Sequence, residues 1–353
     1  MGGRLELRNV YKDFGGFRLD NVSLTLDAGE YYVLVGPTGS GKTLLLETIN
    51  GFHRVDYGVV LFDGHDITDL PPNKRSVGYV PQTPNLNDQH TVRENIEFTV
   101  RLRGLPGDWD GEINGIMKMM KLGPMAGNKA LSLSGGERRK VALARAIVLK
   151  PDLLLLDEPL SSLDVASKQA LRDELRLIHR YLGCTVIHVT HNQLEALELA
   201  TRVGVMRRGG IVNSGTVREV FDDPVDEYAA RFLSYENIYD AEATETGRVT
   251  KMSLGGVTVK AAKPPAEGQT RVGIHGDDVS LHARTPVNVR DNVFRGLVAG
   301  VTDTGPSVTV TLDIGVELRI NQSKRRFQEL GFDAGDRVWV QFSPEAVKQL
   351  APM

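Results

Sequence analysis

The chain lacks several features that mark exported or membrane-spanning proteins. Its 353 residues include one cysteine, Cys184, so no disulfide framework is expected and a reducing cytoplasm suits the sequence. Apolar runs extend over only a few residues at a time, which predicts that no segment spans a membrane. The first residues do not show the charged-then-apolar pattern of an export signal, and we expect none.

An excess of charge of one sign is also missing. The 42 Lys and Arg residues are balanced by 45 Asp and Glu residues, giving a formal net charge of −3. The basic groups at 138–140, 207–208 and 324–326 are short and scattered, and we interpret them as solvated faces. We therefore expect no nucleic-acid partner. The length is sufficient for a large core and a second domain.

A glycine-rich turn lies between an apolar, β-prone run at 31–35 and a helical pattern at 43–49. The turn consists of Gly36, Pro37, Thr38, Gly39, Ser40, Gly41, Lys42 and Thr43. Glycines there turn successive N–H groups towards an anion, and the helix N-terminus adds the positive end of its dipole. Lys42 supplies a charge for the β- and γ-phosphates, and the Thr43 hydroxyl can ligate Mg²⁺. The spacing predicts a nucleotide site rather than an ordinary glycine-rich turn.

Two acidic residues follow a run of four leucines at 153–156. Such a run is typical of a strand buried on both faces of a parallel sheet. Asp157 comes at its carboxyl end, where α/β sheets bind ligands, and we expect it to hold Mg²⁺ through water. Glu158 is then placed to polarise an attacking water. For the pair alone, the alternative is a helix cap followed by a solvated charge.

Ser134, Gly135 and Gly136 precede a helical pattern and leave bare N–H groups that can bind a phosphate, although a capped helix without a ligand is the alternative. With this segment, about the first two-thirds of the chain resembles the ATP-binding cassette (ABC) ATPases. The family's motifs occur in the expected order. By resemblance, the further site residues are Phe14 at the adenine, Gln82 as Mg²⁺ sensor and catalytic residue, Asp164 at the dimer interface, and His191 as the switch histidine.

The resemblance implies a homodimer in which two chains sandwich two ATP molecules head to tail. Ser134, Gly135, Gly136 and Asp164 would then meet the nucleotide of the partner chain, and loss of the γ-phosphate would reopen the dimer. In the family, the Gln82 loop and a helical subdomain meet a membrane permease. The resemblance also implies an extracytoplasmic solute-binding protein as an indirect partner and a location on the inner face of the cell membrane.

The expected fold class is an α/β P-loop NTPase followed by a small all-β module. We place the cassette at 1–235, with a helical subdomain at about 85–144, where Ile113, Ile116, Met117 and Met120 recur at helical spacing. Apolar residues alternate at 308–312, 316–320 and 338–342, which predicts strands. The module at 236–353 is expected to resemble an oligonucleotide-fold barrel. It is similar to the TOBE-like regulatory domain of importer ATPases.

Among importer ATPases, the chain resembles most those for molybdate and tungstate, through residues 12–14, 69–75 and the hairpin at 303–318. Phe327 and Ser343 depart from an oxyanion-binding pattern, which needs N–H, hydroxyl and cationic donors. Importers of sugars, polyamines or another anion are the alternatives. DNA-repair and ribosome-acting ATPases are disfavoured, because no heptad run or cysteine pair separates the phosphate loop from residue 134, and because only one cassette is present.

Overall fold

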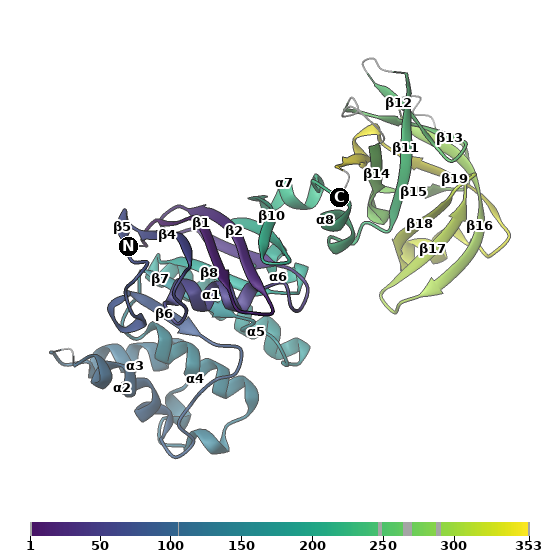
Figure 1. Ribbon diagram of the computed structural model, residues 1–353. Helices are drawn as coiled ribbons and strands as arrows, with labels where there is room; N and C mark the ends of the chain where they lie inside the picture. The colour runs from purple at the N-terminus through teal and green to yellow at the C-terminus, as the bar shows by residue number, and fades with distance from the viewer. Residues whose placement is uncertain (1, 105, 246–248, 264–269, 287–290, 352–353) are drawn as a thin grey trace. The chain divides into compact units, whose positions relative to one another are not determined.

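The computed structural model describes residues 2–104, 106–245, 249–263, 270–286 and 291–351. The chain divides into two compact units, residues 1–217 and 218–353 (Figure 1). Among the helices in these ranges, none combines the length and the apolar character needed to cross a bilayer.

The first unit is built on a six-stranded sheet with the order β10-β9-β3-β8-β7-β6. Its strands are β3 (Tyr31–Val35), β6 (Val77–Val80), β7 (Leu153–Asp157), β8 (Thr185–Thr190), β9 (Arg202–Arg207) and β10 (Gly210–Thr216). All neighbours pair in parallel except β9 and β10. Every residue of β3, β7 and β8 is buried, as the continuous apolar runs of central parallel strands require. The two strands predicted around the nucleotide site are thereby confirmed.

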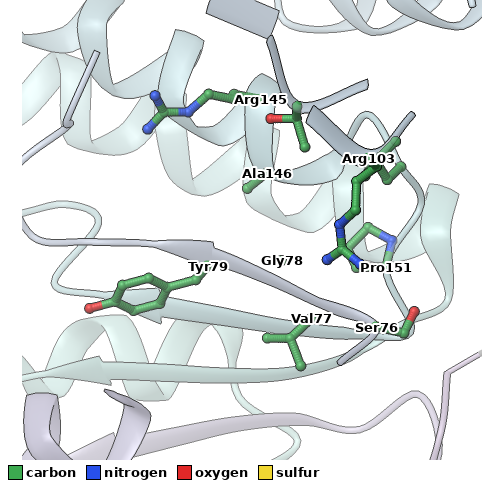
Figure 2. A pocket seen from close by; sticks show the side chains of 10 residues that line it. Ser76, Val77, Gly78, Tyr79, Arg103, Arg145, Ala146 and Pro151 are labelled. Carbon is green, nitrogen blue, oxygen red and sulfur yellow. The ribbon is translucent and has the colours of Figure 1, made fainter. Parts of the chain in front are cut away.

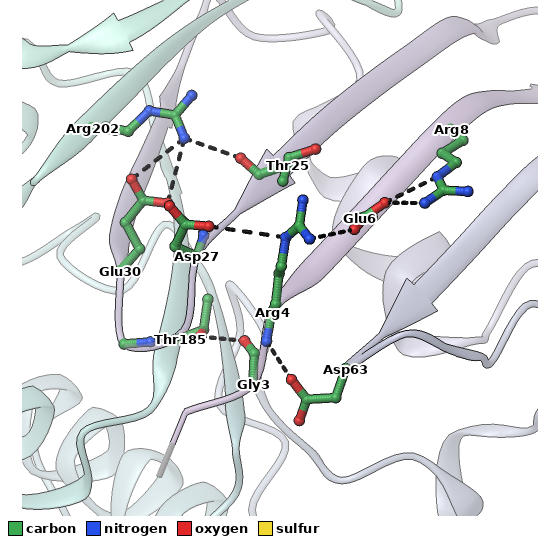
Figure 3. A network of polar contacts seen from close by, with 11 residues as sticks. Gly3, Arg4, Glu6, Arg8, Thr25, Asp27, Glu30, Asp63, Thr185 and Arg202 are labelled. Carbon is green, nitrogen blue, oxygen red and sulfur yellow. Dashed lines mark hydrogen bonds and ion pairs between the residues drawn. The ribbon is translucent and has the colours of Figure 1, made fainter.

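A four-stranded antiparallel sheet, β2-β1-β4-β5, completes this layer of the unit. It contains β1 (Leu5–Asp13), β2 (Arg18–Leu26), β4 (Tyr57–Phe62) and β5 (His65–Asp66). Its alternating apolar residues share one buried cluster with β3, β7, β8 and the helix α1 (Lys42–Asn50). Figure 3 shows polar contacts that join the two sheets: Thr185 Oγ1 donates to the Gly3 carbonyl at 2.6 Å, and the Arg4 N–H donates to Asp63 at 2.6 Å.

Three longer helices lie between β6 and β7 in the sequence and form the helical part of the unit (Figure 1). They are α2 (Val92–Arg103), α3 (Asp110–Met119) and α4 (Gly135–Ile147). The four apolar residues predicted at helical spacing, 113, 116, 117 and 120, are all buried. Two further helices, α5 (Val165–Leu182) and α6 (Gln193–Leu199), follow β7 and β8.

The second unit consists of two five-stranded sheets with the orders β13-β12-β11-β14-β20 and β15-β19-β16-β17-β18. The strands are β11 (Asn237–Glu245), β12 (Thr250–Leu254), β13 (Val257–Ala261), β14 (Thr270–Ile274), β15 (Ser280–His282), β16 (Asn292–Asp303), β17 (Ser307–Asp313), β18 (Glu317–Ser323), β19 (Arg337–Phe342) and β20 (Val347–Leu350). The alternating residues of β17, β18 and β19 point into one apolar core. The all-β class predicted for the tail is confirmed.

A short helix between β18 and β19, α9 (Lys324–Leu330), is absent from the sequence prediction. Its Phe327 is 8% exposed and belongs to the core of the second unit. The aromatic residue that departs from an oxyanion-binding pattern therefore has a packing role, because it anchors α9 on the barrel.

Two short helices, α7 (Val217–Asp222) and α8 (Glu227–Phe232), pack with the β-rich unit. The Tyr235 hydroxyl donates to the Phe221 carbonyl at 3.1 Å, and Arg271 of β14 forms an ion pair with Glu227 of α8. The sequence analysis had placed residues 218–235 in the first domain. Tertiary contacts with β14, distant in the sequence, decide their packing instead.

Candidate functional site

The glycine-rich turn connects the carboxyl end of β3 to the start of α1, as the sequence predicts. Gly39 and Gly41 have φ angles of 81° and 103°, in the left-handed region that favours glycine. A Cβ on Gly41 would lie 2.6 Å from Cζ of Phe17, and one on Gly36 would lie 2.6 Å from the Met206 carbonyl oxygen. The loop is therefore held closely by its neighbours, and larger side chains at these two positions would displace it.

Lys42, the first residue of α1, folds its side chain back over the loop. Its Nζ donates to the carbonyl oxygens of Gly36 at 2.8 Å and Pro37 at 3.0 Å. Burial lowers the pKa of Lys42, while the carboxylates of Glu158 and Asp157 act in the opposite direction. The ammonium group is thus pre-positioned above the backbone N–H groups of the loop, where a phosphate would replace carbonyl partners.

Thr43 and Asp157 connect the loop to the edge of the parallel sheet. The Thr43 hydroxyl donates to Asp157 Oδ1 at 3.0 Å, and Asp157 is 2% exposed. Burial raises the pKa of Asp157, and the hydrogen bond from Thr43 lowers it. A hydroxyl and a carboxylate at this distance are the kind of hard oxygen ligands that suit Mg²⁺.

Three predicted catalytic residues meet around one carboxylate. Nδ1 of His191 lies 3.1 Å from Oε1 of Glu158, and Nε2 of Gln82 donates to Oε2 of the same residue at 3.3 Å. Glu158 follows β7, His191 follows β8 and Gln82 follows β6, which are adjacent strands in the order β8-β7-β6. Because these strands run parallel, their carboxyl ends share one edge, and the three side chains converge there.

The aromatic residues before the loop divide between two positions. Phe14 packs edge-on against His53, with the ring centroids 5.0 Å apart, and is partly buried against the core. Phe17, which the sequence analysis did not select, touches the loop at Gly41. A position close to the phosphate loop in space, not in sequence, distinguishes Phe17, so no sequence signal pointed to it.

The residues expected at the partner's nucleotide form a separate group. Ser134 caps α4 by accepting from the Glu137 N–H, and its own N–H donates to the Glu137 carboxylate at 2.8 Å. Asp164 caps α5, and its hydrogen bonds with Ser167 lower its pKa. Within the described ranges, no hydrogen bond joins 134–136 or 164 to the phosphate loop at 36–43.

One basic residue was misassigned from the sequence. Arg139 was interpreted as part of a solvated face, but it is 5% exposed. Its guanidinium Nη1 donates to the carbonyl oxygens of Gln82 at 2.5 Å and Pro81 at 3.2 Å. The helical spacing of Arg139 with the buried Ala142 and Leu143 was the signal that could have revealed it.

Comparisons with known proteins agree with this arrangement. The ABC transporter family model matches residues 19–161, and the TOBE domain model matches residues 290–349. The molybdate/tungstate import ATP-binding protein of Pyrococcus abyssi is 38% identical over 346 residues, covering 98% of this chain and 99% of that protein. The spermidine/putrescine import ATP-binding protein of Thermotoga maritima is 42% identical over 247 residues, covering 69% of this chain and 67% of that protein.

Solved structures are similar to the first part of the chain. The ADP conformation of MJ1267, an ATP-binding cassette of an ABC transporter, has a TM-score of 0.59 and 26% identity, and covers 66% of this chain and 98% of its own. The phosphate loop, the convergent carboxylates and these matches lead to one conclusion. The chain belongs to the ABC transporter family, as a nucleotide-binding, ATP-hydrolysing subunit of the importer type with a C-terminal TOBE domain.

Proposed function

We propose that the chain hydrolyses ATP with Glu158 as the general base. A water oxygen attacks the γ-phosphorus, its proton passes to the Glu158 carboxylate, and ADP leaves with the electron pair of the broken P–O bond. Lys42 and the backbone N–H groups of residues 36–43 hold the phosphates, and Phe14 stacks on the adenine. The observation that carries this proposal is the Glu158 carboxylate held between Gln82 and His191.

We further propose that Thr43, Gln82 and Asp157 hold Mg²⁺, Asp157 through a water molecule. The bound ion would neutralise charge on the phosphate oxygens. The hydrogen bond between Thr43 and Asp157 supports this assignment, since it brings the hydroxyl and carboxylate oxygens together. Hydrolysis should therefore require Mg²⁺ and stop when the ion is chelated with EDTA.

Ser134, Gly135, Gly136 and Asp164 are proposed to contact ATP bound to a second copy of the chain. Ser134 and Gly135 are exposed, and a Cβ added to Gly135 would meet no atom within 4 Å, so the start of α4 is open to a ligand. Val165, beside Asp164, is 84% exposed and has apolar surface available for a partner. The test is the mass of the protein in solution: ATP with Mg²⁺ should convert a monomer into a dimer, and ADP should not.

The helical part of the first unit is proposed to meet a membrane permease. A pocket of about 290 Å³ is bordered by β6, α2 and α4, immediately before the Gln82 segment (Figure 2). On α2, Phe98 and Leu102 are 49% and 74% exposed. A permease segment seated there would place the chain on the cytoplasmic face of the membrane, with an extracytoplasmic solute-binding protein as an indirect partner.

For the cargo, we propose an oxyanion such as molybdate or tungstate. Relatives with that name match along nearly the whole chain, including the β-rich unit. A polyamine is the second candidate, because relatives named for spermidine and putrescine import are similarly close. ATPase stimulation in vesicles that contain the permease separates the two: molybdate with its binding protein should stimulate hydrolysis, and spermidine with its own should not. The reverse result would assign a polyamine cargo.

A further inference from the structure

The guanidinium of Arg139 connects two segments to which the proposed function gives different ATP molecules. Arg139 belongs to α4, whose first turn follows Ser134. Its hydrogen bonds to the carbonyls of Pro81 and Gln82 reach the segment whose side chain contacts Glu158. One buried side chain therefore joins the expected Mg²⁺ sensor of one site to the helix that faces the other.

A second contact strengthens the same connection. Nη1 of Arg145, also on α4, donates to the Asn85 carbonyl at 2.6 Å, and Figure 2 shows this arginine beside Ala146 on its helix. On the next position after Arg139, Lys140 forms an ion pair with Glu174 of α5. The helix is thus fastened at three points, two of them on the segment that follows β6. Because a helix moves as a rigid element, displacement of this segment is transmitted to Ser134.

The electrostatic surroundings of Arg139 are those of the catalytic centre. Burial lowers the pKa of its guanidinium, while the carboxylates of Asp157 and Glu158 act in the opposite direction. An arginine suits this position because its planar fork of N–H groups can serve two neighbouring carbonyls at once. Lysine would offer a single ammonium group, and a neutral side chain would leave buried carbonyl oxygens without their charged donor.

We propose that Arg139 is a positioning residue that couples Gln82 to the signature helix of the same chain, so that ATP in one site sets the partner's site. The proposal rests on the function proposed above. When ATP orders Gln82, the hydrogen bonds from Arg139 move α4 with it and present Ser134 and Gly135 to the second nucleotide. Hydrolysis should then depend cooperatively on ATP concentration, since the two sites share one mechanical element.

The test compares two variants of the full-length protein. Arg139→Met removes the link, whereas Arg138→Met removes the same charge from the same helix but affects hydrogen bonding to the Ala130 carbonyl and an ion pair with Asp88. For Arg139→Met, we expect kcat to fall about tenfold, the factor associated with one charge-assisted hydrogen bond. The Hill coefficient for ATP should fall to about one. Arg138→Met should keep the cooperativity of the parent.

Affinity for a fluorescent ATP analogue distinguishes positioning from loss of the fold. Arg139→Met should bind the analogue as the parent does, with a similar melting temperature, so that the defect lies in kcat and cooperativity alone. Parent-like kcat and cooperativity in Arg139→Met would overturn the proposal. If that variant does not fold, Arg139→Gln keeps one neutral donor and is judged by the same criteria.

Failure of the proposed function has a separate signature. ATP-driven dimerisation of Glu158→Gln tests the head-to-tail dimer without any change at Arg139. If that dimer forms and Arg139→Met remains cooperative, only the coupling role is wrong. If no dimer forms with Arg139 intact, the shared-site arrangement itself is wrong.

Discussion

Nδ1 of His191 lies 3.1 Å from Oε1 of Glu158, although the two residues follow different strands of the sheet. Glu158 has a φ angle of 43°, and its backbone N–H donates to the Val189 carbonyl at 3.0 Å. The backbone of the glutamate is therefore fixed to the strand that delivers the histidine. The carboxylate has two side-chain partners, His191 on one oxygen and Gln82 on the other, which orient it for proton transfer.

Replacing Glu158 tests its role as the base. Glu158→Gln keeps the size of the side chain but removes its ability to accept a proton from water. We expect ATP binding to persist, hydrolysis to slow by roughly 10²–10⁴-fold, and an ATP-bound dimer to accumulate. Phosphate release and size-exclusion chromatography measure the two effects. Hydrolysis at the parent rate would show that another group accepts the proton.

Replacing His191 removes a contact to that base. In His191→Ala, Glu158 loses its partner on Oε1 while Gln82 remains. Hydrolysis should fall by about 10- to 100-fold, the range for one hydrogen bond to a charged group, with nucleotide affinity unchanged. His188, a buried histidine on the same strand, must be left intact. An unchanged kcat would limit His191 to a structural role.

Lys42 should contribute mainly to binding. Lys42→Ala removes a charge that is placed over the loop carbonyls and is available to the phosphates. The affinity for ATP should fall by at least about tenfold, since charge-assisted hydrogen bonds to phosphate are lost. Titration of a fluorescent ATP analogue measures this change. Lys118→Ala, at an exposed position on α3, is the matched control and should bind as the parent does.

Ser134 separates binding by one chain from closure of the dimer. Ser134→Arg should leave the ATP affinity of the monomer unchanged, because Ser134 forms no hydrogen bond with residues 36–43 in the described part of the chain. The added side chain would occupy the open space at the start of α4. Combined with Glu158→Gln, it should keep the protein monomeric in ATP. A trapped dimer in the double variant would argue against a nucleotide at this helix end.

Much of the catalytic centre was predictable because its motifs are local. The turn at 36–43 needs its glycines for backbone reasons, and the leucine run at 153–156 identifies the strand that carries Asp157. Adjacent parallel strands then bring their ends together, so three separate segments converge by a general rule of such sheets. In the tail, period-two alternation identified β17, β18 and β19 for the same local reason.

Other features depended on contacts between distant residues. Phe17 reaches Gly41 across the sheet, Phe327 enters the core from a helix that alternation could not reveal, and Arg139 finds its partners on another segment. An arginine in a helical pattern has no sequence mark that tells a buried donor from a solvated charge unless its face is followed. The packing of residues 218–235 with β14 was decided in the same way.

The sequence by itself determined the family, the nucleotide chemistry and the two fold classes, because glycine spacing, apolar periodicity and acidic residues after a buried strand act over short stretches of chain. The tertiary structure alone decided which partners those residues meet. It set Glu158 between Gln82 and His191, and it attached α4 to the Gln82 segment through Arg139. Hydrogen bonds of this kind require segments far apart in sequence to be held within about 3 Å, and only the packed core supplies that precision.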